Sequence, residues 1–187
     1  MAQYTKKALA EALKTALQSR PLEKITVKEL VETCQINRQT FYYHFQDIFD
    51  LLGWIYRSEA IEAIRYKKSY GTWQQGLLQI LEYIEENRSL CINTCRSLAR
   101  EHLERFLNET LTDLLGPVVE EIAADTSISD EQKNFIIAFY SYAFTGTLLD
   151  WLKNGLKTPP EVLAGQISML MDGTIRLAVT RNFPPCG

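Results

Sequence analysis

Side chains that can recognise DNA gather between residues 38 and 44. Arg38 can donate a fork of N–H groups to guanine or to phosphate, and Gln39 can pair with the edge of an adenine. Thr40 offers a methyl group to thymine and a hydroxyl group to phosphate. Three more side chains can reach backbone oxygens, contacts that position a protein on DNA without reading sequence: Tyr42, Tyr43 and His44. This chemistry is typical of a helix that enters a DNA groove.

Two short helices are needed to position this stretch. Thr26 and Glu29 have the spacing of a capping box, which predicts the start of the first helix. Asn37 is a good cap for the second. Phe41 and Phe45 are four residues apart, so they share a face and can pack inward while the polar side chains point away. The pattern predicts a helix-turn-helix, with an ordinary helical hairpin filled by aromatic side chains as the alternative.

The order of these residues forms a specific motif. It consists of T-V-x-E-L at 26–30, Asn37, Thr40–Phe41–Tyr42, His44–Phe45 and Leu51–Leu52. Over about residues 5–56 the chain resembles the DNA-binding signature of the TetR family of transcription regulators. By that resemblance seven residues fall where the family contacts operator DNA: Thr26, Arg38, Gln39, Thr40, Tyr42, Tyr43 and His44. It also implies that the protein binds double-stranded DNA as a homodimer.

Two positions depart from the family pattern. Gln35 stands where a turn glycine is usual, so either the turn is reshaped or a non-glycine residue adopts a positive φ. Ile48 stands where many members have a lysine that contacts phosphate, so we expect one backbone contact to be missing. Neither departure removes the motif.

The charge distribution agrees with a DNA-binding N-terminus. The 187-residue chain has a net charge of −3, with 46% hydrophobic and 23% charged residues. Residues 1–46 hold seven Lys/Arg and four Asp/Glu, giving +3, whereas residues 47–187 hold thirteen and nineteen, giving −6. The N-terminus lacks the pattern of a signal peptide, which predicts a cytoplasmic protein. The least polar stretch, 135–149, is too short to span a membrane.

The apolar periodicity predicts an all-α fold of about nine helices in two domains. We expect residues 1–46 to form the three-helix DNA-binding domain and residues 47–187 a helical effector-binding and dimerisation domain. The latter begins with a connecting helix at 47–69, and Gly116–Pro117 predicts an interruption within its middle part.

Two long helices between residues 130 and 182 indicate dimerisation. The first is apolar nearly all round, so a second copy should cover the face that a single chain leaves bare. In the TetR family such a pair forms a four-helix bundle between subunits. The expected interface residues are Phe135, Phe139, Leu148, Trp151, Leu163, Ile167, Leu170, Met171, Ile175 and Ala178.

The helical body offers an effector pocket and little catalytic chemistry. Seven residues could line or anchor the pocket, each with core or surface packing as the alternative: Trp73, Tyr83, Arg100, His102, Phe106, Phe139 and Tyr142. Cys91 and Cys95 share a helical face, but with His102 they fall short of a tetrahedral metal site. We therefore predict no catalytic residues, metal or cofactor.

With these features, the resemblance to the TetR family implies a repressor that releases a palindromic operator when an effector binds. The segment TWQQGLLQILEYIEEN, which follows DLLGWIY, also resembles the subgroup of the family linked to dihydroxyacetone kinase operons. That likeness implies an alternative, an activator or co-regulator that senses its signal through a protein partner. The effector is thus an unknown small molecule or protein. A helical interaction protein that does not read DNA is the alternative from another class.

Overall fold

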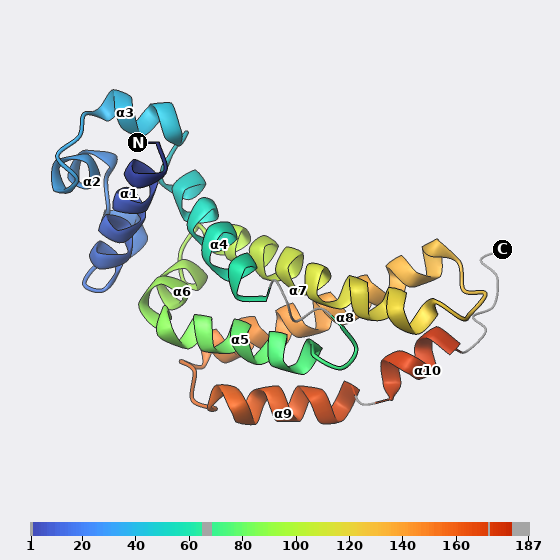
Figure 1. Ribbon diagram of the computed structural model, residues 1–187. Helices are drawn as coiled ribbons and strands as arrows, with labels where there is room; N and C mark the ends of the chain where they lie inside the picture. The colour runs from blue at the N-terminus through green and yellow to red at the C-terminus, as the bar shows by residue number, and fades with distance from the viewer. Residues whose placement is uncertain (1, 65–68, 172, 181–187) are drawn as a thin grey trace. The chain divides into compact units, whose positions relative to one another are not determined.

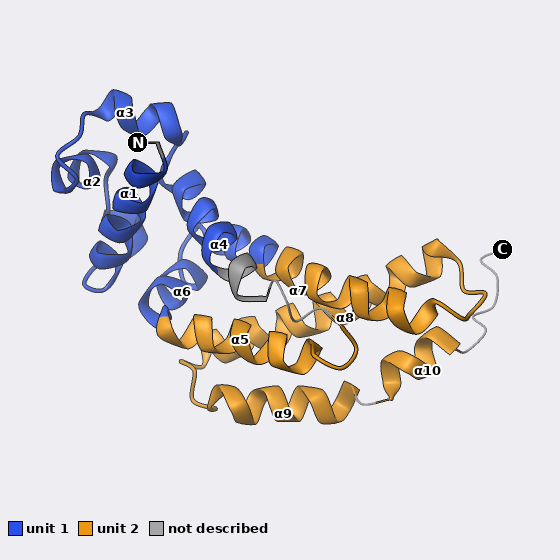
Figure 2. Cartoon of the chain, viewed as in Figure 1, with its two compact units in different colours: residues 1–59, 87–106 blue, residues 60–86, 107–187 orange. Residues whose placement is uncertain are grey.

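The structure is a computed structural model that describes residues 2–64, 69–171 and 173–180. Within this part of the chain the secondary structure is entirely helical, with ten α-helices and one 3-10 helix, η1. The all-α prediction is therefore confirmed. The chain divides into two compact units, and we describe each by itself (Figure 2).

Unit 1 comprises residues 1–59 and 87–106, and unit 2 comprises residues 60–86 and 107–187. The helices follow one another along the chain (Figure 1) as α1 (Ala2–Leu17), η1 (Leu22–Lys24), α2 (Val27–Thr33), α3 (Arg38–His44), α4 (Ile48–Ile64), α5 (Trp73–Glu86), α6 (Arg88–Cys95), α7 (Arg100–Ala123), α8 (Asp130–Lys153), α9 (Pro160–Met171) and α10 (Thr174–Thr180).

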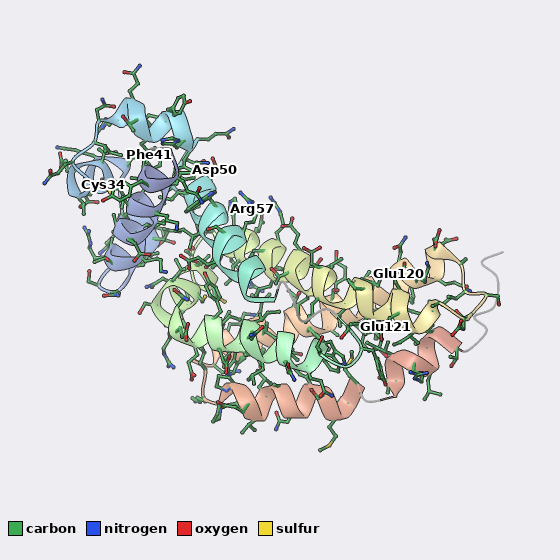
Figure 3. All side chains as sticks on the ribbon, viewed as in Figure 1. Cys34, Phe41, Asp50, Arg57, Glu120 and Glu121 are labelled. Carbon is green, nitrogen blue, oxygen red and sulfur yellow. The ribbon has the colours of Figure 1, made fainter. Side chains whose placement is uncertain are left out.

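The first three helices of unit 1 pack as a small cluster. Leu9, Leu13 and Leu17 place one buried stripe on α1, at the spacing of successive helical turns. Phe41 of α3 is fully buried (Figure 3), and its ring meets the ring of Phe45 at 5.9 Å. The inward packing predicted for these two phenylalanines is confirmed.

The rest of unit 1 fastens α4 to α6 and the start of α7. Tyr56 of α4 is fully buried, and its hydroxyl group donates to Oγ1 of Thr94 at 3.0 Å. Its ring stacks on Phe106 with 4.6 Å between centroids. The amide of Asn93 donates to the backbone carbonyl of Leu17 at 2.7 Å, so α6 is also bonded to the end of α1.

Unit 2 contains an antiparallel pair of long helices, α7 and α8. The pairing is fixed at two levels, because Lys133 donates to Glu120 at 2.8 Å and Thr112 donates to Ser141 at 3.2 Å. Helix α5 lies alongside α9 (Figure 1). The ring of Trp73, at the start of α5, stacks on Phe144 of α8 at 6.4 Å.

Three helix boundaries differ from the sequence-based prediction. Helix α7 continues through Gly116–Pro117, so the predicted interruption is wrong. Proline removes one backbone hydrogen bond, but Pro117 is exposed and water can satisfy the freed carbonyl. The chain is instead interrupted earlier, between the end of α6 at Cys95 and the start of α7 at Arg100.

The final helix predicted to reach residue 182 is also divided. Gly173 has φ +77°, a left-handed conformation that ends α9 and allows α10 to begin. This division explains why the described residues form ten α-helices where about nine were expected. Residues 65–68 of the predicted connecting helix and residues 181–182 of the predicted last helix lie outside the described residues, and Ser69 is not helical.

Candidate nucleic-acid interface

The start of α3 is held by a side-chain cap. The backbone N–H of Thr40 donates to Oδ1 of Asn37 at 2.7 Å, as the sequence predicts. The hydroxyl group of Thr40 donates to the same oxygen at 2.9 Å. Because α3 has only seven residues, it depends on this cap at its start and on the packing of the buried Phe41.

The seven predicted DNA-contact residues lie at the outer surface of α2 and α3. Tyr43 is 82% exposed and Tyr42 is 57% exposed, while Phe41, which precedes them in the helix, is fully buried. The remaining five are exposed or half-buried: Thr26, Arg38, Gln39, Thr40 and His44. The His44 ring packs edge-on against Tyr43 at 4.9 Å. Unit 1 therefore presents guanidinium, amide, hydroxyl and aromatic groups on one short helix.

The turn between α2 and α3 keeps its geometry without glycine. Gln35 has φ +55°, the left-handed conformation, which is one of the two alternatives the sequence leaves open. After this turn the backbone N–H of Ile36 donates to the carbonyl of Val31 in α2 at 2.9 Å, which ties the turn to the end of that helix. The other departure, Ile48, lies at the start of α4 and is half-buried.

The start of α2 is fixed by a reciprocal cap and a salt bridge. Glu29 accepts from the backbone N–H of Thr26 at 2.9 Å, and the Thr26 hydroxyl oxygen accepts from the Glu29 N–H at 3.3 Å. Arg20 donates to the same carboxylate at 2.8 Å. The Arg20 bond, followed by the bonds from Thr26, lowers the pKa of Glu29 to about 2. Thr26 is thus held rigidly at the predicted DNA face.

The lysines of α1 have different neighbours. The ammonium group of Lys6 lies over the rings of Phe45 and Trp54, at 5.5 and 5.9 Å from their centroids. Lys14 is bonded to Glu59, whereas Lys7 is exposed. The ammonium groups of Lys6 and Lys14 therefore make contacts within unit 1, whereas Lys7 faces solvent.

The seven predicted effector-pocket residues have contrasting surroundings. Phe139 and Tyr142 are 60% and 66% exposed on α8. Arg100 is exposed, and His102 stacks on Phe49 at 5.4 Å. Three are buried core residues: Trp73 and Tyr83 in unit 2, and Phe106 in unit 1.

The ten predicted dimer-interface residues divide by burial. Phe135, Phe139 and Leu170 are exposed by 62%, 60% and 76%. Six are buried within the single chain: Leu148, Trp151, Leu163, Ile167, Met171 and Ile175. Ala178 is half-buried. Periodicity marked the apolar residues of these helices but did not distinguish their inner from their outer faces.

Further exposed apolar residues on the same helices were not assigned to this interface. They are Tyr142 on α8, Val162 and Met169 on α9, and Leu177 on α10. Their spacing was the available signal: 135, 139 and 142 repeat as one helical stripe, and 162 and 169 are seven apart. An outer apolar stripe therefore runs along α8 and another along α9.

Helix α8 and the stretch Pro160–Thr180 have the length and composition of membrane-spanning helices. For α8 the burial pattern gives a different explanation. Leu148 and Leu152 are fully buried on its inner side, while Asp150 between them is exposed. Its apolar composition is that of a core helix with a second, exposed apolar stripe.

Comparison with known proteins places this chain among transcriptional regulators. Residues 71–173 match the family model described as "Transcriptional regulator C-terminal region". The HTH-type dhaKLM operon transcriptional activator DhaS of Lactococcus lactis subsp. lactis (strain IL1403) is 30% identical over 175 residues, 92% of this chain and 91% of that protein. An uncharacterised HTH-type transcriptional regulator of Bacillus subtilis (strain 168), YxbF, is 22% identical over 84% of this chain and 42% of its own length.

The fold is shared with a solved structure as well. The dihydroxyacetone kinase operon activator DhaS superposes with a TM-score of 0.74 at 30% identity, covering 92% of this chain and 97% of that one. The likeness therefore extends over both units and is not limited to the helix-turn-helix.

Proposed function

Because this chain belongs to the TetR family of transcriptional regulators, we propose that it binds a palindromic DNA operator as a homodimer, with α3 in the major groove. The observation that carries this proposal is the outer face of α3. On this face Gln39, Tyr42 and Tyr43 are exposed to solvent, while Phe41 packs the opposite side of the helix into the core of unit 1. Arg38 and Gln39 read base edges, and the hydroxyl groups of Tyr42 and Tyr43 contact phosphates.

The homodimer is supported by the exposed apolar stripes of unit 2. Phe135, Phe139 and Tyr142 of α8, with Met169 and Leu170 of α9, are each more than half exposed in the single chain. Pairing with the same face of a second copy would remove this apolar surface from water. A two-fold dimer presents two α3 helices, which explains why the operator should be a palindrome.

The direction of regulation that we propose is activation. The motif alone suggested a repressor released by an effector. However, a relative with 30% identity over nine-tenths of both chains is named a transcriptional activator of the dhaKLM operon. We therefore assign the present chain to cytoplasmic regulators that raise transcription, with an effector that acts through its different affinities for the two states of the protein.

Selection of bound DNA from a random library tests the DNA-binding proposal. We expect a palindrome whose half-sites are about one helical turn or more apart. Affinity for the selected sequence should fall linearly with salt on logarithmic axes, as phosphate contacts require. If no sequence is enriched by an intact dimer, with or without cell extract, the chain is instead a helical interaction protein.

A reporter gene placed behind the selected operator then tests the direction of regulation. Expression of the protein should raise reporter output, and a scrambled operator provides the control. A fall in output would assign the protein as a repressor, while leaving the DNA-binding proposal intact.

A further inference from the structure

A groove of about 270 Å³ lies on the surface of unit 1, and its lining includes none of the seven predicted DNA contacts, although Thr26 lies between two lining residues in the sequence. It is lined mainly by apolar side chains from the turn around η1, the start of α2, the start of α4 and the corner between α6 and α7: Leu22, Ile25, Val27, Ile48, Phe49 and Leu98. Segments far apart in the sequence thus build one depression within one unit.

The groove has a buried floor and an exposed apolar edge. Leu22 and Ile25 form the floor, at 4% and 5% exposure. Leu98 at the edge is 87% exposed, and Phe49 is 36% exposed. The Phe49 ring is held against the imidazole of His102, almost parallel at 3°. The apolar surface therefore continues beyond the cavity itself, which favours an occupant larger than a small molecule.

Two carboxylates complete the lining, and no lysine or arginine belongs to it. Glu23 and Asp47 are both exposed. Asp47 is fixed in place, because its Oδ1 accepts the backbone N–H of Asp50 at 2.8 Å as the cap of α4. Carboxylates beside an apolar floor repel phosphate, so this surface is unsuited to the DNA backbone. They are complementary to a cationic occupant.

We propose that this groove docks a segment of a partner protein that presents a large apolar side chain flanked by lysine or arginine. The apolar anchor would enter the groove and cover Leu98, and the flanking cations would meet Glu23 and Asp47. The docking site is separate from the outer face of α3. Peptide binding can therefore be measured without DNA, and its success or failure is distinguishable from that of the DNA-binding proposal.

A random peptide library displayed on phage, selected against the full-length protein, is the probe. Enriched peptides should carry a large apolar residue next to Lys or Arg. A synthetic peptide of the winning sequence should bind about tenfold more weakly to Leu98→Ser and to Glu23→Gln. Asp47→Asn should weaken binding too, while keeping the helix cap, because asparagine caps as well as aspartate does.

The matched control is Glu32→Gln, which removes an exposed carboxylate of α2 that does not line the groove. It should leave peptide affinity unchanged, and all four variants should still bind the selected operator. The proposal is overturned if no peptide is enriched, or if the winner binds the groove variants as tightly as the wild type. A weaker dimer in Leu98→Ser would assign the groove to a second copy. Phenethylammonium serves as a probe for small organic cations. If no peptide is enriched but this compound binds and the groove variants abolish its binding, the groove is a site for small organic cations.

Discussion

Lys14 of α1 donates to both carboxylate oxygens of Glu59 in α4, at 3.1 and 3.2 Å. The two side chains are only 23% and 29% exposed, so water screens this pair less than it screens a surface ion pair. The bond therefore links α1, which packs against α2, to the connecting helix α4 within unit 1.

A double-mutant cycle measures the strength of that link. Lys14→Met and Glu59→Gln should each lower the free energy of unfolding, and the coupling between them should be about 1 kcal/mol. Lys28 and Glu32 form the matched control, since their atoms are 3.9 Å apart and both side chains are more than 60% exposed. Urea unfolding should give that pair a coupling below about 0.5 kcal/mol. Equal couplings would mean that burial of the Lys14–Glu59 pair adds nothing.

Acidification should weaken the start of α2. The pKa of Glu29 is lowered from 4.5 to about 2, so its ionised form stabilises the folded state above pH 4.5 and this stabilisation is lost as the pH falls towards 2. Glu29→Gln should therefore be less stable than the wild type at pH 7, and the difference should shrink across that window. Urea unfolding at several pH values measures it, with Glu32→Gln as the control. If the stability difference between the wild type and Glu29→Gln did not change with pH, the ionised Glu29 carboxylate would not be what stabilises the start of α2.

Gln35 makes a third prediction, because it has φ +55°. A left-handed conformation costs a side-chain-bearing residue about 1–2 kcal/mol, which exceeds the entropy that glycine loses on folding. Gln35→Gly should therefore raise the free energy of unfolding by about 0.5–1 kcal/mol, and Gln35→Val should lower it. Glu32→Gly, in the last turn of α2, is the control and should be destabilising by up to about 1 kcal/mol. If both glycine variants lose stability alike, the turn is not strained.

Local sequence signals predicted the helix starts well. Thr26 and Asn37 each accept the backbone N–H of the residue three positions later, and each was predicted as a cap from its type and spacing. Ser129 accepts the N–H of Gln132 in the same way at the start of α8. These bonds span three residues, so no tertiary information is needed to foresee them. The helix-turn-helix was predictable for the same reason.

Tertiary surroundings decided what the sequence could not. Pro117 is tolerated inside α7 because it faces water, which its residue type does not reveal. Likewise Phe139 and Leu148 are both apolar residues of α8, yet one is 60% exposed and the other fully buried. The groove at Leu98 combines four segments of the chain, so no single stretch of sequence announced it.

Base recognition by α3 gives the fourth prediction. Arg38→Ala and Gln39→Ala should alter the preferred operator, with losses of about 1–3 kcal/mol at the base pairs that they contact. Tyr42→Phe removes only the hydroxyl group that we propose to contact a phosphate, so binding should weaken similarly for all sequences. Competition among variant operators measures the three profiles. Unchanged preferences in both alanine variants would rule out direct readout by Arg38 and Gln39.

The division between exposed and buried apolar residues makes the last prediction, on dimerisation. Phe139→Glu and Met169→Glu place charges at positions 60% and 81% exposed in the single chain, so each should dissociate a dimer formed through these stripes. Leu148→Ala is the contrasting variant. It removes fully buried methyl groups and should lower the free energy of unfolding by about 2–5 kcal/mol while leaving a folded dimer at low temperature.

Sedimentation velocity and circular dichroism over a range of protein concentrations separate the two effects. If the subunit does not fold alone, the glutamate variants will show helicity that rises with concentration, because association and folding are then coupled. Dissociation of the glutamate variants into folded monomers, or helicity that rises with protein concentration, would each locate the interface on the outer stripes of α8 and α9. If both glutamate variants sediment like the wild type, the interface lies elsewhere. If Leu148→Ala dissociates the dimer without a loss of helicity, the interface involves the side of α8 that carries Leu148.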